Sequence, residues 1–254
     1  MSAGRDEWLL VQQARVAPRF KLFCFPYAGG GPTIFHGWGA ALPGAVEVNA
    51  LRLPGRGTRH LEPAVTDMST MVHAVVDVLE PAFGGMYGLF GHSMGARIAF
   101  EVAREIHRRG LPQPVQLWVS GSRAPQLPPR RAPIHELPEA AFIDELRRYG
   151  GAPAEVFADR ELMQICVPIL RADFALLDTY KHRASPPLSV RLSAFGGSED
   201  PHVRVDDLEA WSEHTSAAFD VQMFAGGHFF LHGAKDLVLA RLAKDLDTWL
   251  TGTS

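Results

Sequence analysis

The segment at residues 86–106 constrains the fold most, because an apolar run leads through the pattern G-x-S-x-G directly into a helical pattern. A strand that passes straight into a helix must turn sharply, and Gly91 and Gly95 remove the side chains that would clash in that turn. The turn would hold the Ser93 hydroxyl at the edge of a sheet. It would also direct the Met94 N–H, at the start of the helix, toward an oxygen that becomes negative. Ser93 is therefore the candidate nucleophile, and an incidental Gly/Ser turn is the alternative.

Extended apolar runs alternate with amphipathic helical patterns along the chain, which is typical of a mostly parallel sheet with helices on both faces. Strands are expected at residues 20–25, 46–53, 86–90, 115–120, 188–195 and 219–224. Helices are expected at residues 68–83, between Ser93 and Arg109, and over residues 239–249. We therefore predict an α/β protein, and the serine turn favours the α/β-hydrolase fold.

The length, net charge and cysteine content of the chain agree with a single enzyme domain. The chain has 254 residues, enough for a sizeable core, and a formal net charge of −3, which argues against nucleic acid as the main partner. Residues 1–19 contain no continuous apolar segment, so neither an export signal nor a membrane span is expected. Cys24 and Cys166 lie far apart in apolar surroundings, which predicts a reduced, cytoplasmic protein.

Two loops that follow expected strands offer partners for the serine. In an α/β-hydrolase the acid and then the histidine follow the serine along the chain, each just after a strand. Asp200 follows the strand at 188–195, and His228 follows the strand at 219–224. His228 is the candidate general base, and Asp200 would fix its tautomer. Glu199 is the main rival for the acid, and Asp200 could instead form an ordinary turn before a proline.

The loop after the first strand, residues 25–32, is rich in glycine. Glycines let a backbone approach a substrate closely, and α/β-hydrolases take their second oxyanion donor from this loop. The Ala28 N–H is the candidate donor, paired with the Met94 N–H. A glycine-rich loop can also cradle phosphate, but this loop does not satisfy G-x-G-x-x-G and has no Lys-Ser/Thr ending. Nucleotide binding is therefore not expected.

Most of the eleven histidines are expected to be solvated or structural. His92 directly precedes Ser93 and is expected to pack beneath the turn. His232 comes four residues after His228, so the two could share a helical face, but no third ligand and no H-E-x-x-H pattern accompanies them. We therefore expect no metal site.

The stretch between two expected strands is too long for a simple crossover. About 67 residues separate the strand that ends near residue 120 from the one that starts near residue 188, whereas a crossover needs only about 20 to 30. Helical patterns occupy residues 139–149 and 160–180 of this stretch. We therefore predict that an insertion at about residues 124–187 forms a helical lid over Ser93.

Several short segments together point to a known family. In chain order they are F-P-Y-A-G-G at 25–30, L-P-G-R at 53–56, G-H-S-M-G at 91–95, L-R-A-D at 170–173, G-G at 196–197 with D-P at 200–201, and G-H at 227–228. In these segments the chain resembles the type II thioesterases, the discrete editing hydrolases of polyketide synthase and non-ribosomal peptide synthetase pathways. The serine motif is shared by many hydrolases, and the F-P-Y-A-G-G, L-P-G-R and L-R-A-D segments are far more specific. One departure is Ser198-Glu199, inserted where the family often has a shorter link.

The resemblance implies that the substrate is an acyl group held as a thioester on the phosphopantetheine arm of an acyl or peptidyl carrier protein. It also implies release of aberrant or stalled acyl units, so that a blocked synthase can resume work. Attack by Ser93 would give an acyl-enzyme and a thiol, after which His228 would activate water, and no cofactor is required. A general carboxylesterase or lipase would share these residues. A non-catalytic acyl- or protein-binding relative would be expected to lack one of them, and a thioesterase domain of a larger synthase is a further alternative.

Arg123, Arg130 and Arg131 lie between the strand at 115–120 and the expected lid. Carrier proteins of this kind tend to present an acidic helix beside the pantetheine arm, so these arginines could form a docking site that speeds association. A solvated basic turn is the alternative.

Overall fold

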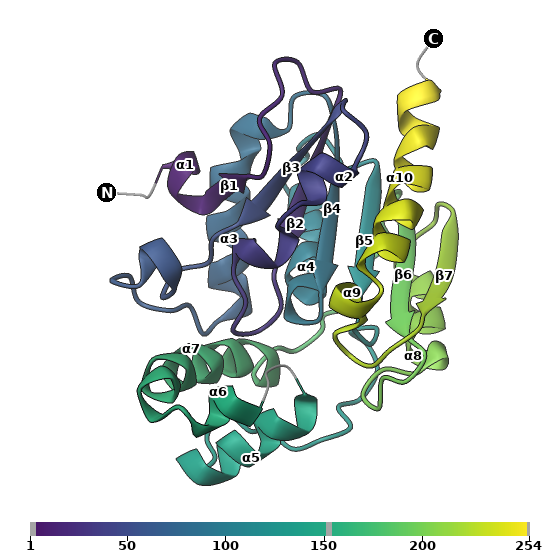
Figure 1. Cartoon of the computed structure of the whole chain (residues 1–254). Helices are drawn as coiled ribbons and strands as arrows, with labels where there is room; N and C mark the ends of the chain where they lie inside the picture. The colour runs from purple at the N-terminus through teal and green to yellow at the C-terminus, as the bar shows by residue number, and fades with distance from the viewer. Residues whose placement is uncertain (1–3, 151–153, 253–254) are drawn as a thin grey trace.

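The computed structural model describes residues 4–150 and 154–252. In this part of the chain seven strands form one sheet, in the order β1-β3-β2-β4-β5-β6-β7 (Figure 1). The strands are β1 (Leu9–Val11), β2 (Phe20–Phe25), β3 (Val46–Leu51), β4 (Met86–His92), β5 (Gln116–Ser120), β6 (Arg191–Gly197) and β7 (Phe219–Phe224). All neighbours are parallel except β1, which pairs antiparallel with β3. The predicted mostly parallel α/β fold is confirmed.

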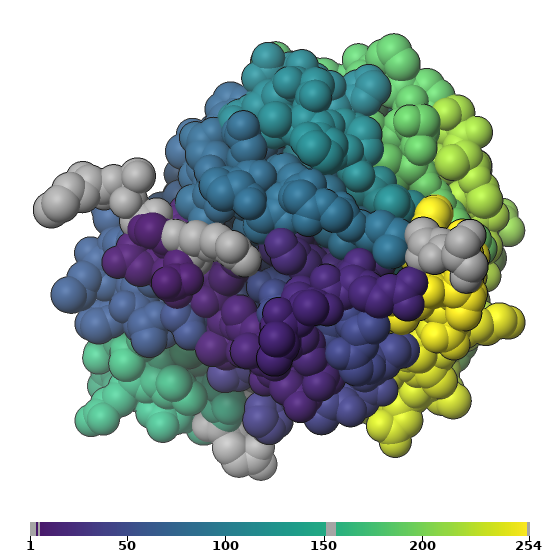
Figure 2. All heavy atoms as spheres, turned by 90° about the horizontal axis from the view of Figure 1, so that it is seen from above, coloured from purple at the N-terminus to yellow at the C-terminus, as the bar shows by residue number. Residues whose placement is uncertain are grey.

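Helices cover both faces of the sheet. One face carries α3 (Met68–Leu79), α4 (Met94–Arg108), α8 (Val205–Glu209) and the 3₁₀ turn η4 (Ala210–His214); the other carries η1 (Pro32–Phe35), α2 (Trp38–Ala41), α9 (Phe230–Gly233) and α10 (Lys235–Thr251). Shorter elements are α1 (Arg5–Trp8), η2 (Gly57–Arg59) and η3 (Glu80–Ala82). Each face buries its own apolar cluster against the sheet, and strand residues alternate between the two clusters because successive side chains point to opposite faces. In Figure 2 the end of the molecule seen from above is built mainly from N-terminal residues, with α10 at one side.

Several element boundaries differ from the prediction, among them the following three. The strand expected from residue 188 begins at Arg191, because Leu188 forms only an isolated bridge with Thr215. The helix expected at 68–83 ends at Leu79, because Pro81 cannot donate the backbone hydrogen bond that would continue it. Strand β3 ends at residue 51 rather than 53.

Strand β1 was not among the strands predicted from the sequence. This strand has three residues and lies at the edge of the sheet, where Leu9 pairs with Leu51. Leu9 is buried and Val11 is exposed. So short a run does not establish a period of two.

The segment expected as a lid contains α5 (Glu139–Tyr149), α6 (Ala154–Ala158) and α7 (Arg160–Asp178). In Figure 1 these helices lie together beyond the carboxyl ends of the parallel strands. They bury a small apolar cluster of their own, separate from the two clusters of the sheet and made of Ile134, Phe142, Leu146, Met163, Val167 and Phe174. Residues 151–153 of the expected insertion lie outside the described residues. Among the described residues, no helix combines the length and apolar character needed to cross a membrane.

The second half of α7 is the part that joins these helices to the body. Leu176 is fully buried in the cluster under the sheet, and Asp173 is also fully buried. Ile165, in the first half, is 64% exposed. The contacts that hold α7 to the body are therefore concentrated near its C-terminus.

We expect this difference in anchoring to appear in hydrogen exchange. Amides of α5 and of residues 160–169 have few contacts with the main core, so they should exchange faster than amides of β4 and β5. Amides of residues 172–178 should exchange more slowly than those of residues 160–169. Peptide-resolved exchange followed by mass spectrometry measures this order. Equally slow exchange throughout α5, α7 and β4 would show instead that the helices are a fixed part of the body.

Candidate active site

The turn between β4 and α4 holds Ser93 in a strained conformation. Its backbone has φ 54° and ψ −113°, and among the described residues it alone has a positive φ without being glycine. Such a conformation costs about 1–3 kcal/mol and persists only where the surroundings enforce it. A Cβ at Gly91 would lie 2.1 Å from the carbonyl oxygen of Gly95, and a Cβ at Gly95 would lie 2.1 Å from that of Phe25. Both glycines are therefore required by close packing.

The structure brings together the three side chains that the sequence analysis singled out. Ser93 Oγ lies 2.9 Å from His228 Nε2, and His228 Nδ1 lies 2.7 Å from Asp200 Oδ2. The Asp200 side chain is fully buried and that of His228 is 5% exposed. A neutral imidazole that donates from Nδ1 to the carboxylate leaves Nε2 free to accept the Ser93 proton. This is the arrangement in which a histidine can activate a serine hydroxyl.

The geometry distinguishes Asp200 from Glu199. The Glu199 side chain is exposed, while its backbone N–H donates to the carbonyl of Gly226. The second oxygen of Asp200, Oδ1, accepts the His202 N–H at 2.8 Å, which fixes the carboxylate. A Cβ at Gly197 would lie 2.4 Å from the Gly227 carbonyl oxygen, so the two glycine-containing loops that carry the acid and the histidine touch through their backbones.

His92 supports the arrangement from below. It is fully buried, and burial holds the pKa of its imidazole well below the usual value, so the ring is neutral. Its Nε2 lies 2.9 Å from the His228 carbonyl oxygen and must donate to it, which leaves Nδ1 to accept from the Ser120 hydroxyl. As expected, His92 packs beneath the serine turn, and its contact holds the backbone of His228.

The two expected oxyanion donors remain free of protein partners. No hydrogen bond of the described residues uses the N–H of Ala28 or of Met94. The neighbouring Gly29 N–H, in contrast, donates to Asp173 Oδ2 at 2.7 Å. Met94 begins α4, so its N–H is one of the unpaired donors at a helix N-terminus.

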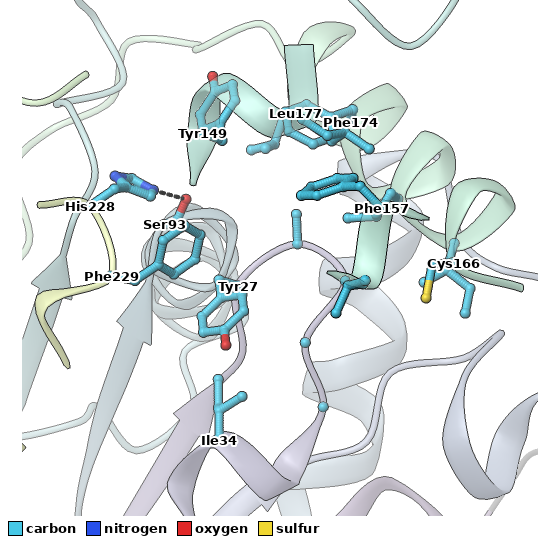
Figure 3. Close-up of a pocket in the computed structure, with 18 of the residues that line it drawn as sticks. Tyr27, Ile34, Ser93, Tyr149, Phe157, Cys166, Phe174, Leu177, His228 and Phe229 are labelled. Atoms are coloured by element: carbon cyan, nitrogen blue, oxygen red, sulfur yellow. Dashed lines mark hydrogen bonds between the residues drawn. The ribbon is translucent and has the colours of Figure 1, made fainter. Parts of the chain in front are cut away.

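An apolar cavity of about 390 Å³ opens beside Ser93 and His228. Figure 3 shows Ser93 and Tyr149 toward one end of it and Cys166 at the other. The walls come from the loop after β2, from α5, α6 and α7, and from the loop after β7, and include Tyr27, Ile34, Leu146, Phe157, Leu170 and Phe229. None of the described lining residues is Lys, Arg, Asp or Glu. No lining residue of the helices was predicted, because helical periodicity does not separate side chains that face a cavity from those that seal a core.

Tyr149 and His202 were not predicted as neighbours of the site. Tyr149, at the end of α5, stacks on the His202 ring with centroids 4.2 Å apart, and both rings pack edge-on against His228. Burial, followed by the nearby His228, lowers the pKa of His202, which favours an uncharged ring beside the site. No local sequence signal indicates such a contact, because it depends on how α5 docks.

The remaining histidine of interest, His232, contacts a tyrosine of the loop after β2. His232 Nε2 lies 2.9 Å from the Tyr27 hydroxyl, and burial lowers the pKa of its ring. Within residues 4–150 and 154–252, no group of three or more His, Cys, Asp or Glu side chains could hold a metal ion.

The three arginines considered for docking all have partners inside the protein. Arg123 and Arg130 contact the two oxygens of Asp207 at 2.9 and 2.8 Å, and that side chain is 2% exposed. Arg131 contacts Asp178, at the end of α7, at 2.9 Å. A buried carboxylate needs such cations, so these contacts favour a structural role for the basic segment over the docking role.

Comparison with known proteins identifies the family. The thioesterase domain model matches residues 20–250. The linear gramicidin dehydrogenase LgrE of Brevibacillus parabrevis is 39% identical, over 97% of this chain and 95% of its own. The thioesterase PikA5 of Streptomyces venezuelae is 36% identical, over 89% of this chain and 82% of its own. The solved structure of the type II thioesterase BorB, from the borrelidin biosynthetic cluster, has a TM-score of 0.86 at 34% identity, covering 96% of this chain and 99% of its own.

The dehydrogenase name of the first relative has no counterpart in the site of this chain. The glycine-rich loop at residues 25–32 lacks the G-x-G-x-x-G pattern of dinucleotide-binding loops. The serine, histidine and carboxylate lie instead at the carboxyl edge of the sheet, beside an apolar cavity. The predicted resemblance to the type II thioesterases and the predicted serine thioesterase activity are confirmed, and the chain belongs to the thioesterase family.

Proposed function

We propose that this enzyme removes acyl groups from the phosphopantetheine arm of acyl or peptidyl carrier proteins, with Ser93, His228 and Asp200 as its catalytic triad. The observation that carries the proposal is the hydrogen-bonded chain of these three side chains at the mouth of an apolar cavity. PikA5 is named a thioesterase, and BorB is a type II thioesterase of a biosynthetic cluster. Cys24 and Cys166 are both free thiols, which supports a reducing, cytoplasmic setting.

In the first half of the reaction Ser93 Oγ attacks the thioester carbonyl carbon while its proton passes to His228 Nε2. The carbonyl oxygen becomes an oxyanion, which the free N–H groups of Ala28 and Met94 are placed to bind in our proposal. Asp200 stabilises the imidazolium that forms. The carbon–sulfur bond then breaks, and the pantetheine thiol leaves with the proton from His228, so that an acyl-enzyme ester remains.

In the second half a water molecule takes the place of the thiol. His228 accepts a proton from this water as its oxygen attacks the ester carbonyl, and a second oxyanion forms in the same position. Collapse of this intermediate returns the proton to Ser93 Oγ and releases the carboxylic acid. The free enzyme is restored.

We further propose that α5, α6 and α7 act as a lid. All three helices lie in a single long insertion between β5 and β6. They supply much of the cavity wall, including Leu146, Phe157 and Leu170. An apolar wall near the nucleophile excludes water and holds an acyl chain by burial of its surface. Movement of this layer would admit a substrate arm that is attached to a second protein.

Replacement of Ser93 by alanine is expected to abolish turnover without unfolding the protein. Loss of the nucleophile in a triad lowers kcat by about 10⁴- to 10⁶-fold. Removal of one hydroxyl from a strained turn should change the free energy of unfolding little. Hydrolysis of an acyl-carrier substrate and thermal unfolding measure the two effects. A folded variant with nearly normal turnover would contradict the role of Ser93.

Replacement of Asp200 by asparagine is expected to reduce kcat by about 10⁴-fold, because an amide favours the wrong tautomer of His228. The matched control is Glu199→Gln, which makes the same chemical change at the adjacent, exposed position. The control should keep kcat within about threefold, since its side chain does not contact the histidine. The reverse order of effects would assign the acid role to Glu199.

The apolar wall predicts that the enzyme hydrolyses neutral acyl groups faster than charged ones. We expect butyryl-carrier protein to be hydrolysed at least about tenfold faster than malonyl-carrier protein, because the malonyl carboxylate would lose its water without meeting a cation in the cavity. Acetyl and longer acyl groups on the same carrier give the dependence on chain length. Ethyl butyrate is the comparison that tests the esterase alternative, and faster hydrolysis of this oxygen ester than of butyryl-carrier protein would contradict the proposed function.

A further inference from the structure

A buried ion pair joins the lid helix to the loop that follows β3. Arg56 Nη1 and Nη2 donate to Asp173 Oδ2 and Oδ1, each at 2.6 Å, and the two side chains are only 7% and 1% exposed. The pair is bidentate, the geometry that makes guanidinium–carboxylate contacts strong and directional. Arg56 and Asp173 are the last residues of the L-P-G-R and L-R-A-D segments, and 117 positions separate them in the sequence.

The same carboxylate also holds the loop that carries the proposed oxyanion donor. Asp173 Oδ2 accepts the Gly29 N–H at 2.7 Å, and Arg56 Nη1 reaches toward the Gly30 carbonyl oxygen at 3.4 Å. Gly29 has φ +75°, and a Cβ there would lie 2.6 Å from Leu170 Cδ2 on α7. The loop therefore rests on α7 through one hydrogen bond and one close apolar contact.

Stability alone does not account for this arrangement. The two charged side chains lose most of their hydration when they are buried. A protein in which apolar side chains of similar volume replace a buried ion pair is often equally stable or more stable. What apolar side chains cannot supply is an acceptor for the Gly29 N–H. That hydrogen bond fixes the peptide unit next to Ala28, whose own N–H is free.

We propose that Asp173 is a positioning residue, which sets the Ala28–Gly29 backbone in its oxyanion-binding conformation only while α7 is docked. Arg56 compensates the charge of the buried carboxylate, and the carboxylate orients the loop. Since Asp173 belongs to the lid helix, withdrawal of α7 removes the acceptor, so the oxyanion site is complete only in the closed enzyme. The proposal rests on the proposed function, and in particular on Ala28 as an oxyanion donor.

Two double variants test whether the Gly29 N–H needs a hydrogen-bond acceptor at position 173. Arg56→Met with Asp173→Asn and Arg56→Met with Asp173→Leu both remove the two charges, and asparagine and leucine have nearly the same shape. They differ in that asparagine keeps a carbonyl oxygen for the Gly29 N–H. A matched control is Arg59→Met with Glu62→Gln, which removes a neighbouring ion pair of 2.5 Å that has no contact with Gly29. Thermal unfolding curves identify an assay temperature at which all variants are folded.

The readout is binding of two substrate analogues that differ in the oxyanion. A butyl trifluoromethyl ketone forms a tetrahedral adduct with the serine and needs the oxyanion donors, whereas butyl-pantetheine thioether only occupies the cavity. We expect the leucine variant to lose at least about tenfold in affinity for the ketone, since loss of one whole oxyanion donor costs about 10²- to 10³-fold. The asparagine variant and the control should stay within about threefold of wild type. All variants should bind the thioether equally, and kcat should follow the ketone while KM changes little.

Equal ketone affinity in the asparagine and leucine variants would overturn the proposal, whether both keep it or both lose it. Failure of the wild-type enzyme to form the ketone adduct would instead overturn the proposed function, and this inference with it. A further measurement uses the wild type alone: the Gly29 amide should be protected from hydrogen exchange, because its N–H is bonded to Asp173 while α7 is docked. Exchange at Gly29 as fast as at an exposed, unbonded amide would also overturn the proposal.

Discussion

The close contact between the turn after β4 and the end of β2 is the constraint on which the rest of the site depends. Gly95 lies so near Phe25 that a single Cβ would meet its carbonyl oxygen at 2.1 Å. This contact holds the turn that carries Ser93 against the beginning of the loop after β2. It also enforces the positive φ of Ser93, because the turn has no room to relax. The strain at Ser93 is thus balanced by packing between the first turn of α4 and the end of β2.

The loops at the carboxyl edge are held to one another mainly through backbone groups. His92 donates to the carbonyl oxygen of His228, Gly197 lies against Gly227, and Asp173 accepts from Gly29. In each case a residue of one strand or helix holds the backbone of a neighbouring loop. Such contacts define the site more sharply than side-chain packing could, because a hydrogen bond is directional and an apolar contact is not.

The helices α5, α6 and α7 pack as a separate layer, and one of them also contacts the loop after β2 at this edge. Their own apolar cluster is separate from the main core, and in our proposal they move as a lid. Yet α7 also carries Asp173, whose carboxylate is bound by Arg56 and binds the loop. In our proposal the element that admits the substrate is therefore also the element that completes the oxyanion site.

By itself the sequence determined the fold class, the position of the serine turn and the two loops that hold Asp200 and His228, because each depends on a short pattern of apolar residues and glycines. Parallel strands end at one edge, so local patterns suffice to place these residues together. Only the tertiary structure decided which of two adjacent carboxylates meets His228, that Arg123 and Arg130 serve Asp207, and that Arg56 meets Asp173. Those choices depend on how segments far apart in the chain pack, and no local periodicity encodes the partner of a long polar side chain.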